Sequence, residues 1–309
     1  LRTYTQKPDT SSNRTNQYPL AIANGILSRR FGILAKEEGS LILSGSASRS
    51  AYFKMIEQGG IEVTPAEGKW KEAVPILEQE LRKAVQFGFT EEELKEVKAN
   101  LINSAEEAVK RKDTRRSNGI AMQFIGAIGE RNVFTTPETN LELAKSALGR
   151  ITTEDCQKAF NEFWDTKDLS LVLTTPAAPD SAAEELKTIF LKSGATEVTA
   201  PTEKTLTPFA YTNFGEPGVV VQETKIEDLS ATQLMLSNNI RVNYKQTEFQ
   251  KNSISINARF GSGQLSQPSG ISGLNRFASA IFEAGGLGKH SADDLQRLLA
   301  GKNVSVGFG

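Results

Sequence analysis

Apolar residues recur at helical spacing through much of the first two hundred positions. The stretch 18–39 illustrates the pattern, because one face of the helix that it predicts is apolar, formed by Leu20, Leu27, Phe31 and Leu34. Pro19 suits its first turn and Gly39 suits its end. Similar patterns predict further helices over 69–88, 91–112, 119–130, 153–164 and 181–194.

Strand-like stretches lie between these helices. They cover 1–6, 40–50, 51–58, 61–65 and 168–175. Two adjacent glycines, Gly59 and Gly60, are expected to divide two of these strands. Since the helices are many and the strands are adjacent, the pattern predicts an α+β fold with helices packed on one face of a mostly antiparallel sheet.

The pattern changes near residue 200. The segment 201–217 contains several Pro, Thr and Gly residues without helical periodicity, which indicates an interdomain linker. Strands are then predicted over 219–226, 231–237, 240–246 and 253–260, with a hairpin turn at 237–239. Apolar and polar residues alternate in 253–260, as expected of a half-buried strand.

Two helices are predicted after these strands. The first covers 272–286 and places Leu274, Phe277, Ala278, Ile281 and Phe282 on a face that should be buried in a core. The second begins after Ser291, and the end of the chain resembles a strand. The sequence therefore predicts a domain over 1–200, the linker 201–217, and the first part of a second α+β domain over 218–309.

Composition narrows the possible functions. The 309 residues are 38% hydrophobic and 24% charged, with a formal charge of −1. This length suggests about two domains of roughly 100–200 residues each, and the balanced charge gives no overall attraction to nucleic acid. No apolar run is long enough to span a bilayer. A single cysteine and a single histidine exclude an internal disulfide and a two-histidine zinc site.

Both ends of the sequence suggest a fragment of a longer polypeptide. The chain starts with Leu1 rather than methionine and shows no secretory signal pattern. Its last residues, "NVSVGFG", look like an unfinished strand. The missing signal therefore does not decide localisation.

Five features are candidate sites, and each has a simpler explanation. The basic cluster at 110–116 fits the solvated C-terminal end of a helix, and the glutamates at 91–93 fit a helix N-terminus capped by Thr90. Cys156 lies within a predicted helix and has no histidine near it in sequence, so a catalytic thiol is not expected. His290 precedes a helix cap and is expected at the surface. The glycine-rich stretch 261–273 lacks the spacing of a phosphate-binding loop.

The run 226–286 resembles the opening of a domain in the insulinase/pitrilysin family of zinc metallopeptidases, the inverzincins. "LSNNIRV" matches the start of such a domain, with Asn239 where glycine is usual. The catalytic domains carry G-hydrophobic-x-H-x-x-E-H on the following helix. Counted from Gly273, the histidine positions fall on Arg276 and Ala280, and the glutamate position falls on Ser279. The resemblance thus implies no catalytic or metal-binding residue in this chain, and its binding residues stay unidentified.

Earlier segments extend the resemblance over nearly the whole chain. The stretch 4–39, which contains "PDT", and the stretch 88–101 resemble the second domain of that family. "TPFAYTNFGEPG" at 207–218 resembles the bridge between its two halves. The family has four homologous α+β domains around a closed chamber for peptides. Zinc is held in the first domain, and the third domain is commonly degenerate.

The resemblance implies that residues 1–200 match the second, non-catalytic domain and residues 218–309 match the start of a degenerate third domain. The parent protein would be a zinc metalloendopeptidase, with zinc in the catalytic domain against which this chain packs. Peptides or small proteins would be its substrates, and a homo- or hetero-dimer is possible. Nucleic acid and a membrane span are not expected, and family analogy suggests the bacterial periplasm or cell envelope.

An alternative is a catalytically inactive homologue that serves as structural or substrate-binding partner of an active peptidase. A nucleic-acid-binding module would rest only on the cluster 110–116.

Overall fold

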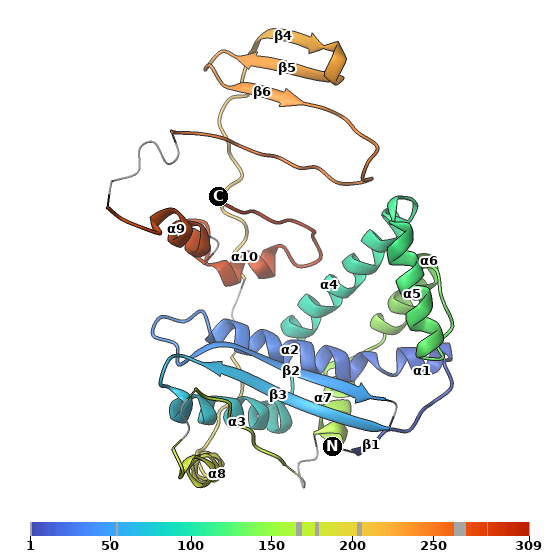
Figure 1. Ribbon diagram of the computed structural model, residues 1–309, viewed down its shortest axis with the longest axis vertical. Helices are drawn as coiled ribbons and strands as arrows, with labels where there is room; N and C mark the ends of the chain where they lie inside the picture. The colour runs from blue at the N-terminus through green and yellow to red at the C-terminus, as the bar shows by residue number, and fades with distance from the viewer. Residues whose placement is uncertain are drawn as a thin grey trace.

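The computed structural model describes residues 2–53, 55–164, 169–176, 179–202, 206–262, 270–282 and 284–308. Within these ranges the chain forms two antiparallel three-stranded sheets, shown in Figure 1. The first has the order β1-β3-β2, with strands Arg2–Thr3, Ile56–Pro65 and Ile42–Tyr52. The second has the order β4-β5-β6, with strands Val220–Ile226, Ala231–Leu236 and Arg241–Tyr244. The predicted α+β class is confirmed.

Helices accompany the first sheet and were mostly predicted. They are α1 (Ser11–Thr15), α2 (Tyr18–Leu34), α3 (Trp70–Phe87), α4 (Glu91–Lys110), α5 (Ser117–Gly129), α6 (Pro137–Leu148), α7 (Thr153–Phe163) and α8 (Ala182–Ser193), with a 3₁₀ turn at Lys112–Thr114. The sequence interpretation missed α1 and α6. For α6 a signal was present, because Thr136 caps the helix and Pro137 occupies its first turn.

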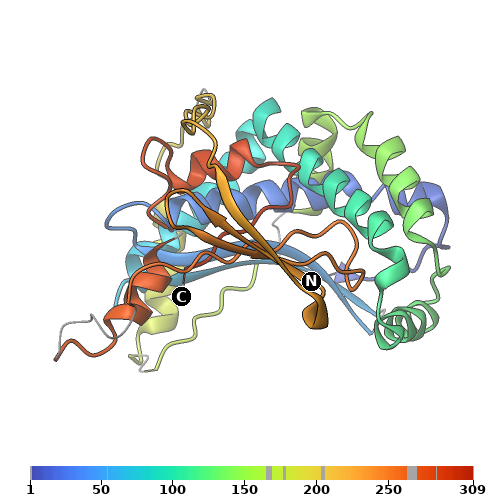
Figure 2. The same cartoon turned by 90° about the horizontal axis from the view of Figure 1, so that it is seen from above.

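The main core lies between α2 and the first sheet. Ile22, Ile26, Leu27 and Phe31 of α2 are fully buried, and α2 packs on β2 and α7 (Figures 1 and 2). Helix and strand approach closely at Gly45, where a Cβ atom would lie 2.8 Å from the Cβ of Phe31. Each fully buried side chain of this size contributes about 1.5–3 kcal/mol. This packing makes the first sheet and its helices a compact unit.

The paired glycines do not divide two strands, as the sequence suggested. Gly59 and Gly60 both lie inside β3, which pairs with β2 without interruption at this point. A Cβ atom at Gly59 would lie 2.6 Å from the ring of Phe163 and 3.2 Å from that of Trp164. Glycine is therefore required for the close approach of α7 to the sheet and not for a turn.

Three further strand predictions are wrong for the residues that the structure describes. The segments 169–175, 253–260 and 303–308 have no ladder partner and are not strands. In 253–260 the alternating side chains of Ile254 and Ile256 are 90% and 87% exposed. The period-2 pattern is present, but no described part of the chain provides the neighbouring strand that would bury it.

The hairpin between β5 and β6 is confirmed. β5 and β6 are antiparallel, and Asn239 in the turn has φ 66°, which asparagine tolerates. Two helices follow, α9 (Leu274–Phe282) and α10 (Ala292–Leu298). The apolar face predicted for the first of them is formed, but α9 has no buried residue.

Polar contacts connect α10 to the first unit. Arg29 of α2 donates to Glu96 of α4 at 3.0 Å and also pairs with Asp293 of α10. The backbone N–H of Gly301 donates to the side-chain oxygen of Asn100 at 2.8 Å. These contacts place α10 beside α2 and α4, as seen in Figure 2.

Candidate functional site

The three motif positions on α9 carry no group suited to zinc. Arg276 is exposed, and a guanidinium group carries hydrogen-bond donors but no acceptor lone pair that could ligate a metal. The hydroxyl of Ser279 donates to the backbone oxygen of Asn275 at 2.9 Å. Ala280 has no polar side chain. A zinc ion with a water-activating base therefore does not fit this helix.

The rest of the described chain offers no replacement site. Among the residues that the structure describes, no group of three or more His, Cys, Asp or Glu side chains is placed to hold a metal ion.

No described helix combines the length and apolar character needed to cross a bilayer.

The acidic run 91–93 forms the first turn of α4, which Thr90 and Glu93 cap as expected. The Thr90 hydroxyl accepts from the N–H of Glu93 at 3.3 Å, and the Glu93 carboxylate accepts from the N–H of Thr90 at 2.9 Å. Glu93 also forms a two-pronged ion pair with the buried Arg30, with distances of 2.6 and 2.8 Å. The same carboxylate thus caps α4 and joins it to α2.

Cys156 is a core residue. Its side chain is fully buried on α7, and burial raises the pKa of its thiol to about 12. A nucleophilic cysteine needs a readily formed thiolate. The thiolate of Cys156 is harder to form in this environment; that Cys156 is not catalytic stays a prediction.

His290 was expected at the surface, and this prediction is wrong. The side chain is only 2% exposed, and its ring stacks on Phe209 with 5.4 Å between the ring centroids. Its Nε2 accepts from the backbone N–H of Ala210 at 2.9 Å. Tyr211 completes the contact, because its hydroxyl donates to the oxygen of Leu287 at 3.1 Å. His290 therefore connects part of the predicted linker to the loop before α10. The hydrogen bond joins two residues that lie 80 positions apart in the sequence.

A partly buried ion pair near the start of the chain was missed by the sequence interpretation. Arg14 of α1 binds both carboxylate oxygens of Asp9. Asp9 also accepts from the N–H of Val133 at 2.6 Å, while Arg14 donates to the oxygen of Val133 at 2.6 Å and to Thr135 at 2.9 Å. The hydrogen bond from Arg14 is the main reason that the pKa of Asp9 falls to about 2. The pair anchors the loop between α5 and α6 to α1.

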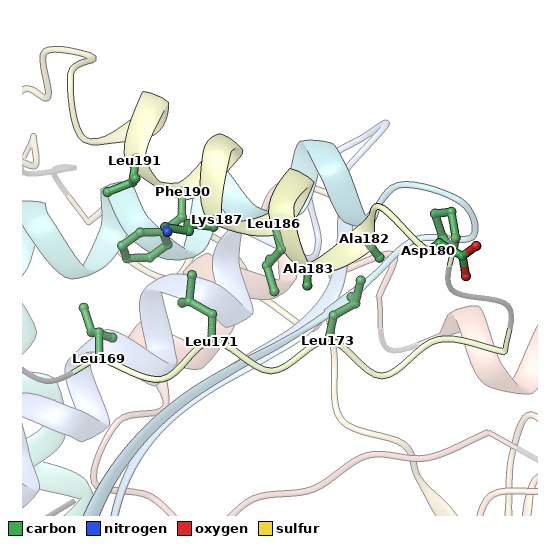
Figure 3. Close-up of a pocket in the computed structure, with 11 residues that line it drawn as sticks. Leu169, Leu171, Leu173, Asp180, Ala182, Ala183, Leu186, Lys187, Phe190 and Leu191 are labelled. Atoms are coloured by element: carbon green, nitrogen blue, oxygen red, sulfur yellow. The ribbon is translucent and has the colours of Figure 1, made fainter.

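An apolar groove lies between α8 and the extended segment 169–173. Figure 3 shows leucines of the segment pointing toward α8, whose own apolar side chains point back at them. The groove has a volume of about 750 Å³ and is lined mainly by Leu169, Leu171, Leu173, Leu186 and Phe190, with Asp180 and Lys187 as its charged groups. This lining suits apolar contacts and offers neither a nucleophile nor a paired acid and base.

Comparison with known proteins reveals one curated relative. No family model matches the chain. The chain is 23% identical over 274 residues to "Probable zinc protease PqqL" of Escherichia coli strain K12. The similarity covers 85% of this chain but only 29% of that protein. The chain thus spans less than a third of the length of its relative.

Solved structures share the fold. The crystal structure of the periplasmic protease PqqL from Escherichia coli superposes with a TM-score of 0.55 at 17% identity, over 97% of this chain and 33% of that one. A structure described as "Predicted insulinase family protease from Yersinia pestis" gives a TM-score of 0.53 at 15% identity, over 62% of this chain and 42% of that one. The predicted resemblance to insulinase-type proteases is confirmed at the level of fold, and in sequence the chain is similar to a probable zinc protease.

Proposed function

We propose that this chain is a non-catalytic part of a zinc-dependent metalloendopeptidase that degrades peptides in an enclosed chamber. The observation that carries the proposal is the sequence similarity to a probable zinc protease along 85% of the chain. In the same proposal, residues 1–200 are a second domain, 201–217 a linker, and 218–309 the start of a degenerate third domain. Zinc would be held by another domain of the longer protein, against which this chain packs.

The contribution of this chain is then structural. Helix α9 carries no zinc ligand and no catalytic base at its motif positions Arg276, Ser279 and Ala280. It would therefore form part of the chamber wall and not an active site. The ion pair between Arg29 and Asp293 would help to hold the two units in one arrangement. By analogy with its relative, which is described as periplasmic, the protein would act in the periplasm or cell envelope.

Zinc content and peptidase activity test this proposal directly. The purified chain is dialysed against zinc, its metal content is measured by plasma mass spectrometry, and hydrolysis of a quenched fluorescent peptide is followed. We expect less than one tenth of a zinc ion per chain and no hydrolysis. One zinc per chain, with hydrolysis abolished by a chelator, would overturn the proposal.

A second candidate function follows from the same helix. If the whole protein also lacks a zinc motif, it would be an inactive homologue that supports an active peptidase subunit or presents substrate to it. The reading frame preceding Leu1 decides between the two. An H-x-x-E-H helix there supports the peptidase, whereas a frame without it, together with co-purification of an active homologue, supports the partner role.

A further inference from the structure

Helix α5 is apolar, and the part of the chain that the structure describes leaves it almost entirely uncovered. Its thirteen residues include no charged side chain, and none of them is buried. Met122 is 66% exposed, Phe124 51%, Ile125 60% and Ile128 64%. At 100° per residue these side chains, with Ile120, cover more than half of the helix circumference. A helix of this composition is normally enclosed by other protein.

The apolar surface continues beyond the helix. Val133 is 62% exposed, and the ring of Phe134 packs edge-on against Phe124 with 5.5 Å between centroids. We call α5 together with Val133 and Phe134 the α5 surface. Figure 1 shows α5 at the right of the view, beside α6 and the upper end of α4. The ion pair of Asp9 and Arg14 holds its far end in place through Val133.

The N-terminal end of the α5 surface is positively charged. Arg116 is the N-cap residue, α5 has no acidic residue in its first turn, and no side chain caps it. The side chain of Arg115 donates to the backbone oxygen of Lys112 and to the side-chain oxygen of Gln123. Within the described residues neither Arg115 nor Arg116 has a carboxylate partner. Two arginines beside the positive end of a helix dipole are unfavourable unless an anion lies nearby. The surface therefore complements an apolar segment that carries carboxylates at one end.

We propose that the α5 surface binds polypeptide segments in which an apolar run is flanked by acidic residues. The inference rests on the proposed function, in which such segments would be substrate. A second copy of the chain fits less well. Glu130, the residue after α5, is followed by Arg131, so this end offers no net negative charge to the basic end. A lipid surface also fits less well, since an interfacial helix needs an apolar face opposite a charged face, and α5 has no charged residue.

Peptide binding by fluorescence anisotropy tests the proposal. The probes are two fluorescein-labelled peptides with the same Leu/Phe-containing run, one ending in three glutamates and the other in three lysines. We expect the acidic peptide to bind at least ten times more tightly. The double variant Ile125→Asn/Ile128→Asn should weaken its binding at least tenfold. Arg115→Glu/Arg116→Glu should reverse the preference between the two peptides.

The matched control is Ile254→Asn, which replaces another exposed isoleucine outside the α5 surface. It should leave binding unchanged, and circular dichroism should show that every variant is folded. If the acidic peptide binds the double variant Ile125→Asn/Ile128→Asn as tightly as it binds the control variant, the proposal is overturned. Dimerisation in sedimentation that Ile125→Asn/Ile128→Asn abolishes would also overturn it, as would binding to vesicles of phosphatidylglycerol and phosphatidylcholine in place of peptide. Zinc content and hydrolysis report on the proposed function separately, so the two failures are distinguishable.

Discussion

Replacing Asp9 by asparagine tests how much the ion pair with Arg14 stabilises the first unit. The change removes the charge that Arg14 binds and leaves a similar shape. A carboxyl pKa that moves from 3.8 to about 2 corresponds to at most about 2.5 kcal/mol of folding free energy. Because the Arg14 side chain is 25% exposed, water screens the pair, and we expect a loss of about 1 kcal/mol at pH 7.

The pH dependence has a definite sign. The pKa of Asp9 is lower in the folded chain than in the unfolded one, mainly because Arg14 donates to its carboxylate. The stabilisation is therefore complete above the unfolded value near 3.8 and is lost as the pH falls through about 2. The difference between the wild-type chain and Asp9→Asn should be constant from pH 7 to pH 5 and should shrink below pH 4.

Urea unfolding followed by tryptophan fluorescence measures this difference, since both tryptophans, Trp70 and Trp164, lie in the first unit. Asp113→Asn is the control, because Asp113 is 61% exposed and its nitrogen–oxygen distance to Lys251 is 3.5 Å. That variant should be as stable as the wild type within about 0.5 kcal/mol. The reasoning is refuted if Asp9→Asn does not lower the free energy of unfolding at pH 7, or if it lowers it by the same amount at pH 3.

Three further predictions concern the core and the caps. Gly59→Ala should destabilise by about 1–3 kcal/mol, because the new Cβ atom would lie 2.6 Å from Phe163. Gly60→Ala, whose Cβ atom meets nothing closer than 3.7 Å, should cost much less in the same urea titration. The Cys156 thiol, with its pKa raised to about 12, should not react with Ellman's reagent at pH 8 until the chain is unfolded, and fast reaction of the native chain would contradict its burial. Thr90→Ala should cost about 1 kcal/mol through the lost cap, and Thr90→Ser should restore most of it.

Helices and their starts could be read from the sequence because their determinants are local. The caps expected at Thr90 and Ser291 form, and Thr152 caps α7 in the same way. The apolar spacing in 18–39 predicts only part of the buried face of α2. Leu27 and Phe31 are fully buried, and Leu20 and Leu34 are partly buried. The fully buried Ile22 and Ile26 were not in the predicted face. In each case the deciding residues lie within a few positions of one another.

Strands were predicted less well because a strand needs a partner. The stretches 169–175 and 253–260 have the right residue types, yet no neighbouring strand is present among the described residues. The sequence pattern records which side chains should be buried and does not record what buries them. The same reason explains why the apolar face of α9 was predicted but is exposed.

The sequence by itself determined the α+β class, the positions of most helices and the absence of zinc ligands at the motif positions on α9. Tertiary structure alone decided that Gly59 serves close packing, that His290 is buried on Phe209, and that Asp9 reaches Val133. These contacts join residues between 80 and 124 positions apart. Local spacing carries no information about such distances, because only the folded chain brings those groups together.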